Sequence, residues 1–463
     1  MESNDIKLNY QAALDYLYSF VDYSLTRAFR YTADKFNLDR MVLLLESIGN
    51  PQKGYKVIHI AGTKGKGSTA AFCAEALSTA GFKVGLYTSP HLEDYCERIQ
   101  VNGEPISHEE MTHLVSYIKP FVAGIPHLTT FEITTAIGFL YFSRKSADVV
   151  VAEVGLGGRL DATNVITPVV SVITSISHDH TNVLGHTLKD IAGEKCGIIK
   201  PGVPVVCSPQ KEEALAVIQD TATNRESPLT LVGRDVHFVQ VQHSIDGQTF
   251  YIWNAEDQEK MDQFIESGKD SDWMPDLYEI HLLGFHQLEN ATTAFATLSV
   301  CSRSGLKVSK KAIKDGFKTV QWPARFEILN RRPLLIVDAA HNRDSATRLR
   351  LALDDYIPDK KIELIFGASE DKDIEGILTE ILPRVERVYA TKSEHPRAID
   401  PDILVKLVHQ MGKPAIAFNK VEDALEAILK KTTKDTAIVA TGSIFIAAAV
   451  RTTWLKRSKE HKK

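Results

Sequence analysis

A glycine-rich segment that carries two lysines, Gly62-Thr63-Lys64-Gly65-Lys66-Gly67-Ser68, has the residue types that bind phosphate groups. Glycines allow backbone N–H groups to approach an anion closely, and a helix that starts there adds the positive end of its dipole. The lysine at position 66 is placed to reach terminal phosphates. A hydroxyl at Ser68 or Thr69 is placed to assist a bound magnesium ion. The segment therefore predicts a nucleotide site.

The same segment departs from the strict phosphate-loop pattern G-x-x-x-x-G-K-[ST], because Ile60 holds the first glycine position and Gly67 the hydroxyl position. Considered alone, it is as compatible with an ordinary glycine-rich turn as with nucleotide binding. Its context favours the nucleotide site. Residues 56–60 predict a strand, 68–80 an amphipathic helix and 83–87 the next strand, which together make a βαβ unit around the loop.

Three further side chains lie at the ends of predicted strands: Ser89 and His180 follow a strand, and Glu153 closes one. In open α/β sheets, ligands bind beyond the carboxyl ends of the strands. A hydroxyl, a carboxylate and an imidazole beside a phosphate loop can form a magnesium shell. Taken singly, each is more often structural, as a cap, an ion-pair partner or a hydrogen-bonded histidine. Lys195, taken alone, is expected to be a surface lysine at the end of a helix.

The elements that position these side chains predict an α/β fold. Near-continuous Val/Ile runs at 148–153 and 169–175 are typical of strands buried on both faces of a parallel sheet. The segment 212–279 is less regular and is expected to add a small antiparallel sheet. Helices are predicted at residues 10–20, 38–48, 130–142, 287–302 and 309–317.

A proline-interrupted segment at 320–327 marks the expected domain boundary, which gives domains 1–322 and 323–463. Beyond it, short apolar runs alternate with helical patterns, which predicts a second α/β domain. The charged tail at 456–463 is expected to be solvated and frayed. Strands of the second domain are predicted at 334–338, 362–367, 387–390 and 436–440.

Composition excludes several classes of protein. The chain of 463 residues suits two domains, and a net charge of −5 argues against a nucleic-acid binder. Five scattered cysteines without a C-x-x-C pair predict free thiols in a reducing compartment, with neither a disulfide framework nor a zinc site. No leader or bilayer-spanning run is evident, so we expect a cytoplasmic protein without a membrane partner.

With these segments assembled, the chain closely resembles the folylpolyglutamate synthase and dihydrofolate synthase group of the Mur ligase superfamily. The resemblance covers nearly the whole chain, in the family's order. It implies an N-terminal P-loop ATPase-type parallel-sheet domain and a smaller C-terminal Rossmann-like α/β domain, acting as a monomer. The segments that carry it are 61–68, 87–92, 97–99, 153–164, 179–185, 194–200, 284–290, 322–325 and 338–342.

The resemblance also implies roles for individual residues. Ser89 and Glu153 would hold one magnesium ion, and Glu153 with His180 a second. Lys195 would be carbamylated by carbon dioxide, which replaces the surface reading given above. The implied catalytic residues are Lys66, Lys195, His180 and His341. ATP would be bound by residues 62–68, with Asn290 near the adenine, Arg325 at the phosphates and Asp338 near the ribose. The folate and glutamate side would be lined by Arg98, Glu132 and Asp161.

Three positions depart from the family pattern. Lys64 stands where the family usually has Asn, which adds a cation beside the phosphates. Ala339 and Arg343 stand where Gly and Pro are frequent. None of these changes removes an implied catalytic group.

The implied reaction adds L-glutamate to a folate such as tetrahydrofolate, or to dihydropteroate, through an acyl phosphate made from ATP. The segment 159–161 favours activity on both acceptors. Closure about residues 322–325 would shield the acyl phosphate from water. Three alternatives stay open: another Mur-type amino-acid ligase, which in peptidoglycan synthesis carries a further N-terminal domain; a P-loop ATPase without ligase activity; and a silent binding protein.

Overall fold

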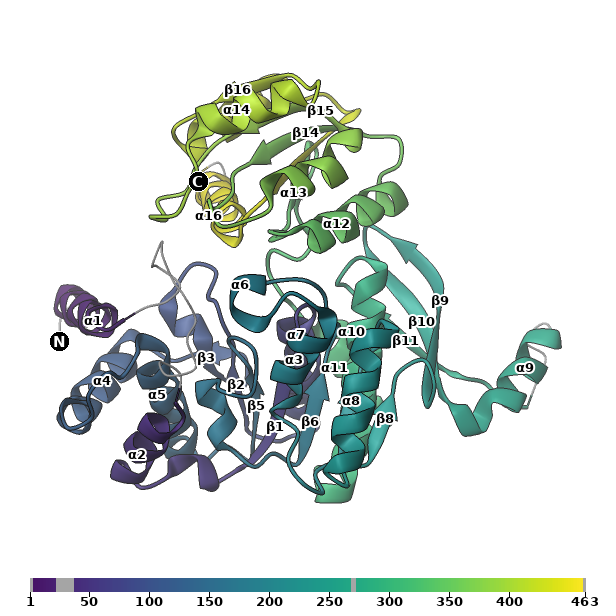
Figure 1. Cartoon of the computed structure of the whole chain (residues 1–463). Helices are drawn as coiled ribbons and strands as arrows, with labels where there is room; N and C mark the ends of the chain where they lie inside the picture. The colour runs from purple at the N-terminus through teal and green to yellow at the C-terminus, as the bar shows by residue number, and fades with distance from the viewer. Residues whose placement is uncertain (1–2, 22–36, 268–271, 461–463) are drawn as a thin grey trace. The chain divides into compact units, whose positions relative to one another are not determined.

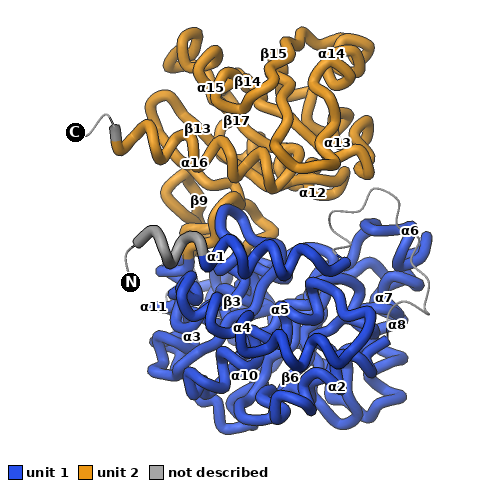
Figure 2. The backbone as a smooth tube through the Cα atoms, turned by 90° about the vertical axis from the view of Figure 1, so that its left-hand side faces the viewer, with its two compact units in different colours: residues 1–240, 250–279, 288–320 blue, residues 241–249, 280–287, 321–463 orange. Residues whose placement is uncertain are grey.

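The computed structural model describes residues 3–21, 37–267 and 272–460. The chain forms two compact units (Figure 2). Unit 1 comprises residues 1–240, 250–279 and 288–320, and unit 2 comprises 241–249, 280–287 and 321–463. Unit 2 thus includes two segments that precede the boundary predicted at residues 322 and 323. That boundary stays a prediction.

Unit 1 is built on an eight-stranded sheet (Figure 1). Its short outer strands β3 and β4 pair antiparallel, β3 pairs antiparallel with β2, and the other neighbours are parallel. Every residue of the Val-rich strand β5 is buried, as predicted for a strand covered on both faces. The order is β4 (Glu104–Pro105), β3 (Ile99–Val101), β2 (Val84–Tyr87), β5 (Val149–Glu153), β1 (Lys56–Ala61), β6 (Val170–Ile173), β7 (Val205–Cys207), β8 (Leu229–Leu231).

Helices of unit 1 pack on this sheet through separate apolar clusters. One cluster joins the first, second, fourth and fifth helices to strands β1, β2 and β5. Another joins the seventh and eighth helices to β6 and β7. The helices are α1 (Ser3–Tyr18), α2 (Asp39–Ser47), α3 (Lys66–Thr79), α4 (His108–Ala123), α5 (Thr130–Arg144), α6 (Thr181–Leu184), α7 (Leu188–Cys196), α8 (Glu212–Asn224), α9 (Gln258–Glu266), α10 (Phe285–Cys301) and α11 (Lys310–Thr319).

The segment 212–279 is more regular than its sequence suggested. It begins with helix α8, and β8 extends the large parallel sheet. The expected small sheet follows, with β10 (Gly247–Asn254) between β9 (Val236–Ser244) and β11 (Asp276–Ile280). The two-residue connection between β9 and β10 makes them an antiparallel hairpin. Helix α8 escaped prediction because its buried stripe consists of only Ala214, Ile218 and Ala222.

Unit 2 confirms the predicted Rossmann-like α/β fold. Its six-stranded sheet is parallel except for the outer strand β12. The sheet order is β12 (Glu327–Arg331), β13 (Leu334–Val337), β17 (Thr436–Thr441), β14 (Lys361–Phe366), β15 (Val385–Ala390), β16 (Ala415–Ala417); the helices are α12 (Arg343–Tyr356), α13 (Ile374–Ile381), α14 (Pro401–Gln410), α15 (Val421–Leu429) and α16 (Ile444–Glu460).

The prediction of a frayed tail from residue 456 is wrong for the part of the tail that the structure describes. Helix α16 continues to Glu460, and residues 461–463 lie outside the described residues. Its basic last turn suits the negative end of the helix dipole. None of the described helices combines the length and apolar character needed to cross a bilayer.

Candidate active site

Strand register explains why the predicted site residues of unit 1 meet at one edge of its sheet. Ile60 of β1 pairs with Glu153 of β5, and Tyr87 of β2 pairs with Ala152. The residues that follow these strands therefore leave the sheet at the same level, at its carboxyl edge. The order of strands also reverses about the central strand β1, where α/β sheets bind ligands.

The phosphate loop connects β1 to α3 and depends on two glycines. Gly62 has φ +152° and Gly65 has φ +87°, which favour glycine. A Cβ at Gly62 would lie 1.9 Å from Thr174 Oγ1, and one at Gly65 would lie 2.2 Å from Asn290 Oδ1. The loop is therefore shaped by close neighbours, and the buried Asn290, predicted to lie near ATP, is one of them. Helix α3 begins at Lys66, so its N-terminal backbone N–H groups belong to the loop.

The segment after β6 supports this loop from the other side. The backbone N–H groups of Thr63 and Lys64 donate to Ser175 O at 2.9 and 3.0 Å, and Thr63 Oγ1 donates to Ser177 O at 3.1 Å. Lys64 Nζ lies 3.1 Å from Asp179 Oδ2, whose side chain is 9% exposed. The sequence analysis assigned no role to Asp179. Its position just after a strand that neighbours β1 was the available signal.

Glu153 is the carboxylate at the centre of this edge. Its side chain is 7% exposed, and Oε1 lies 3.9 Å from Lys66 Nζ. The backbone N–H of Ser89 donates to Oε2 at 3.2 Å. The structure thus brings together three predicted residues: the loop lysine and two proposed magnesium ligands.

His180 lies at the start of α6, with φ +50° and a side chain that is 46% exposed. Its Nε2 is 3.8 Å from Asp179 Oδ1, so it shares that carboxylate with Lys64. Its predicted role as a metal ligand stays a prediction.

Lys195 is buried on α7, which makes the expectation of a surface lysine wrong. Its Nζ donates to Gly62 O in the phosphate loop at 2.9 Å. Burial and, to a smaller extent, the nearby cation of Lys66 lower the pKa of this ammonium group to about 7. Near neutral pH, a substantial fraction of the amine is therefore uncharged and nucleophilic.

Asp161 orders the segment that follows β5. Its Oδ2 accepts from Leu156 N at 2.9 Å, and its Oδ1 accepts from Thr163 N at 3.0 Å. Burial raises the pKa of this carboxyl group. In the same segment, a Cβ at Gly158 would lie 2.8 Å from Lys195 O. Asp161 therefore helps to shape a loop packed against the helix that carries Lys195.

Two other residues predicted on the substrate side also have structural partners. Glu132 Oε2 accepts from Thr129 N at 2.8 Å and completes the capping box of α5, while Oε1 lies 3.2 Å from Arg40 Nε. Arg98 Nε donates to His91 Nδ1 at 2.9 Å. Burial and the cation of Arg98 lower the pKa of His91 to about 4, so this imidazole is neutral at pH 7.

In unit 2, the predicted residues gather beyond β13. Asp338 Oδ2 accepts from Phe326 N and Oδ1 from Ala340 N, both at 2.8 Å. Arg325 directly precedes Phe326 and donates from Nη1 to a neighbouring backbone carbonyl at 3.0 Å. His341 Nδ1 lies 2.8 Å from a backbone carbonyl oxygen of the same turn.

Comparison with known proteins adds an independent result. The Mur ligase middle domain matches residues 60–298, and the Mur ligase glutamate ligase domain matches residues 324–444. The chain is 34% identical over 429 residues to the dihydrofolate synthase/folylpolyglutamate synthase of Bacillus subtilis, covering 90% of this chain and 94% of the relative. It is 34% identical over 456 residues to the folylpolyglutamate synthase of Lacticaseibacillus casei, covering 97% and 99%. A solved structure of Escherichia coli FolC in complex with DHPP and ADP matches with a TM-score of 0.81 at 29% identity, covering 98% of each chain.

Proposed function

The chain belongs to the Mur ligase family, and on this premise we propose that it is an ATP-dependent ligase that joins L-glutamate to the carboxylate of a folate. The observation that carries the proposal is the group formed by Lys66, Glu153 and the buried amine of Lys195 around the phosphate loop. This group combines the cation of Lys66, for a transferring phosphoryl group, with the carboxylate of Glu153, for a metal. The match to the glutamate ligase domain supports an amino-acid acceptor step.

The phosphate loop fits a nucleoside triphosphate. Gly62 and Gly65 have no room for side chains. Because the loop carries no Cβ at these two positions, an anion can approach its backbone N–H groups at the start of α3. Lys66 supplies a positive charge there. We assign the loop residues 62–68 and Asn290 to ATP, together with Arg325 and Asp338 from unit 2.

The donor set beside the loop fits magnesium, because it offers a buried carboxylate from Glu153 and a hydroxyl from Ser89. We assign these two residues to one ion and Glu153 with His180 to a second. When bound, magnesium neutralises the charge that builds on a transferring phosphoryl group.

We propose that Lys195 is carbamylated. Its neutral amine forms a bond to the carbon of carbon dioxide, and the displaced proton passes to solvent. The pKa of about 7 supports this step, since only the neutral amine is a nucleophile. A carbamate would place a negative charge beside Lys66 and Lys64, the cations that disfavour the ammonium form.

In the reaction, an oxygen of the folate carboxylate attacks the γ-phosphorus of ATP, and the bond from phosphorus to the ADP oxygen breaks. The product is an acyl phosphate. Lys66 and Arg325 stabilise the charge on the transferring group. The neutral amine of L-glutamate then attacks the activated carbonyl, and the tetrahedral intermediate releases phosphate and leaves an amide. Activation is needed because a free carboxylate is a poor acyl donor.

For the acceptors, we assign Arg98, Glu132 and Asp161 to the folate side and His341 to L-glutamate. Glu132 and Asp161 act chiefly by shaping the backbone, since their carboxylates hold a helix cap and a loop. The free cysteines support a reducing, cytoplasmic setting. The substrates named here are the partners that we propose.

The direct test incubates the chain with ATP, magnesium, L-glutamate and either tetrahydrofolate or dihydropteroate, and measures ADP release and the mass of the product. We expect ADP release that depends on glutamate, together with a product one glutamyl residue heavier. Release of ADP without an amino acid would instead indicate a P-loop ATPase. Activity with dihydropteroate would show that the enzyme uses both acceptors.

Lys195→Ala tests the carbamate separately, with Lys189→Ala on the exposed face of α7 as its control. In ¹³CO₂-equilibrated buffer, a carbamate carbon resonance is expected in the wild type and in Lys189→Ala and not in Lys195→Ala. Its absence from the wild type would remove the modification while leaving the ligase proposal intact.

A further inference from the structure

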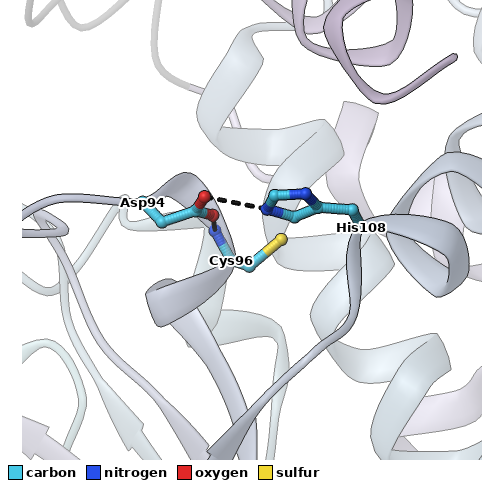
Figure 3. A group of neighbouring side chains, drawn as sticks. All are labelled: Asp94, Cys96 and His108. Atoms are coloured by element: carbon cyan, nitrogen blue, oxygen red, sulfur yellow. Dashed lines mark hydrogen bonds and ion pairs between the residues drawn. The ribbon is translucent and has the colours of Figure 1, made fainter. Parts of the chain in front are cut away.

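Away from the phosphate loop, three side chains with metal-binding atoms converge at the start of α4 (Figure 3). Asp94 caps the short helix η3 (Tyr95–Arg98), Cys96 lies within that helix, and His108 is the first residue of α4. One ligand atom from each lies within 4.8 Å of the others. These residues have no place in the ligase chemistry proposed above.

We infer that Asp94, Cys96 and His108 form a zinc site. Zinc binds cysteine sulfur, histidine nitrogen and carboxylate oxygen in tetrahedral sites, and a set of three protein ligands leaves the fourth position to water. The mixture of sulfur, nitrogen and oxygen does not suit magnesium, which prefers oxygen ligands. The sequence predicted no zinc site because its cysteines form no C-x-x-C pair, whereas the ligands here are one cysteine, one histidine and one aspartate.

The carboxylate of Asp94 is already held for this role. Its Oδ1 accepts from Cys96 N at 2.8 Å and from Tyr10 Oη at 2.9 Å. Its Oδ2 lies 2.8 Å from His108 Nε2. A zinc ion would take the place of the proton shared by this oxygen and nitrogen. Ligating carboxylates in metal sites are commonly held by such outer hydrogen bonds.

Tyr10 of α1 provides a second outer contact. Its ring stacks on the imidazole of His108 with a centroid distance of 3.7 Å and an interplanar angle of 7°. The stacking fixes the plane of the imidazole, and the hydroxyl fixes Asp94. Tyr10 is therefore a positioning residue for the site.

The chemistry of Cys96 is consistent with an ion that enters by displacing protons. Its Sγ–H donates to Tyr10 Oη at 3.4 Å. On binding, the S–H bond breaks, a sulfur–zinc bond forms and the proton passes to water. The thiolate and Asp94 together then balance the two positive charges of zinc.

The site is accessible to an ion from solvent, since the side chains of Asp94 and His108 are 42% and 43% exposed. A bound ion would fasten η3 to α4. Because η3 ends at Arg98, the ion would also stiffen the turn that carries this residue.

The experiment uses the full chain without an affinity tag, stripped with a chelator and dialysed against zinc in the presence of excess magnesium. Bound metal is measured by mass spectrometry. Cobalt is then substituted, and the thiolate-to-cobalt charge-transfer band is recorded. We expect one zinc per chain and a clear sulfur band in the wild type.

Two site variants, Cys96→Ser and His108→Gln, are compared with two controls, Cys207→Ser and His113→Gln. Cys207 is a buried cysteine elsewhere in unit 1, and His113 is an exposed histidine of α4. The site variants should lose zinc affinity by at least about 100-fold and the controls should retain it. Tyr10→Phe, which keeps the ring and removes the hydroxyl, should weaken binding about 10-fold.

Circular dichroism of the metal-free proteins checks that each variant folds. If Cys96→Ser does not fold, the zinc affinity of His108→Gln tests the proposal, because His108 is half-exposed and its replacement disturbs the packing less. Absence of zinc from the wild type, a cobalt spectrum without a sulfur band, or equal retention by site variants and controls would each overturn the proposal. The three residues would then form, together with Tyr10, a hydrogen-bonded cluster that joins α1, η3 and α4.

Discussion

Two regions of the molecule place a carboxylate at the carboxyl end of a parallel strand, and they use it differently. In unit 1, Glu153 lies 3.9 Å from the ammonium of Lys66, in a group of buried charges around the phosphate loop. In unit 2, the two oxygens of Asp338 accept backbone N–H groups from Phe326 and Ala340. The first carboxylate balances charges that can rearrange about a ligand, whereas the second maintains a turn.

The comparison shows that position at a strand end does not by itself define a chemical role. The partners do. Charged partners store electrostatic free energy that binding can change, while backbone partners convert the side chain into part of the scaffold. The phosphate-loop edge should therefore respond strongly to changes in charge, and the β13 edge should respond through stability.

The largest expected effect concerns Lys195→Met and its dependence on pH. Burial lowers the folded-state pKa of Lys195 from 10.5 to about 7, so between these values the unfolded chain binds the proton and the folded chain does not. The wild type should gain stability relative to Lys195→Met as pH rises from 7 to 10. The free energy of unfolding of the methionine variant should exceed that of the wild type most strongly below pH 7. The pKa difference sets this excess at no more than roughly 5 kcal/mol.

Urea denaturation in buffer free of carbon dioxide measures this difference. The exposed Lys189→Met on the same helix serves as the control. Its free energy of unfolding should differ from that of the wild type by an amount that does not vary with pH. A flat profile for Lys195→Met would contradict the lowered pKa and weaken the contrast between the two regions.

Lys66→Met should reduce kcat/KM for the ligase reaction by about 10³-fold, because it removes a preorganised cation from the transferring phosphoryl group. The exposed Lys83→Met, in the connection from α3 to β2, is the control and should retain activity. Steady-state assays with ATP as the varied substrate give the values. A loss of less than tenfold would mean that the charges at this edge are structural, as at β13.

Features with a local signal in the sequence could be predicted, whereas contacts between distant segments could not. The loop, the strand ends and the family could be predicted, because glycine-rich turns and runs of Val and Ile have strong local signals. The pairing of Lys64 with Asp179 could not, because it depends on two loops that leave adjacent strands. The cluster at Asp94 likewise arises only when the β3–β4 hairpin brings His108 back to η3.

Short elements also escaped prediction for physical reasons. Strands β8 and β16 have three residues each, too few to show a period. The backbone hydrogen bonds of Glu132 and Asp161 also escaped prediction, although Thr129 and Glu132 have the spacing of a capping box.

Gly65→Ala tests the steric precision of the phosphate loop. Its Cβ would meet Asn290 Oδ1 at 2.2 Å, whereas a Cβ at Gly81, with a similar φ of +92°, would meet nothing within 4 Å. Both variants bear a backbone cost of about 1 kcal/mol. Only Gly65→Ala should also lose activity, by about 100-fold in kcat/KM. Equal kinetic losses would mean that backbone strain, and not the contact with Asn290, controls the loop.

Asp338→Asn should lower the free energy of unfolding of the chain by about 2 kcal/mol. The amide has one acceptor oxygen, so one of the two backbone N–H groups that now donate to the carboxylate would lose its acceptor. Asp359→Asn, an exposed change in the same unit, should have no measurable effect. Thermal and urea unfolding measure both. If Asp338→Asn leaves the free energy of unfolding unchanged, the carboxylate does not maintain the turn and the contrast with Glu153 fails, whereas a change in the KM for ATP would support its assignment to the nucleotide.

The smallest effect concerns the ion pair between Lys64 and Asp179, whose side chains are 15% and 9% exposed. A double-mutant cycle with Lys64→Gln and Asp179→Asn should give a coupling free energy of about 1 kcal/mol in unfolding measurements. Because the pair is partly buried, raising the salt concentration should reduce the coupling only slightly. Asp179→Asn alone should also lower the pKa of Lys195 further, since the carboxylate raises it. A coupling near zero would mean that Asp179 supports the loop only through its backbone, which would make this part of the phosphate-loop edge resemble the turn at β13.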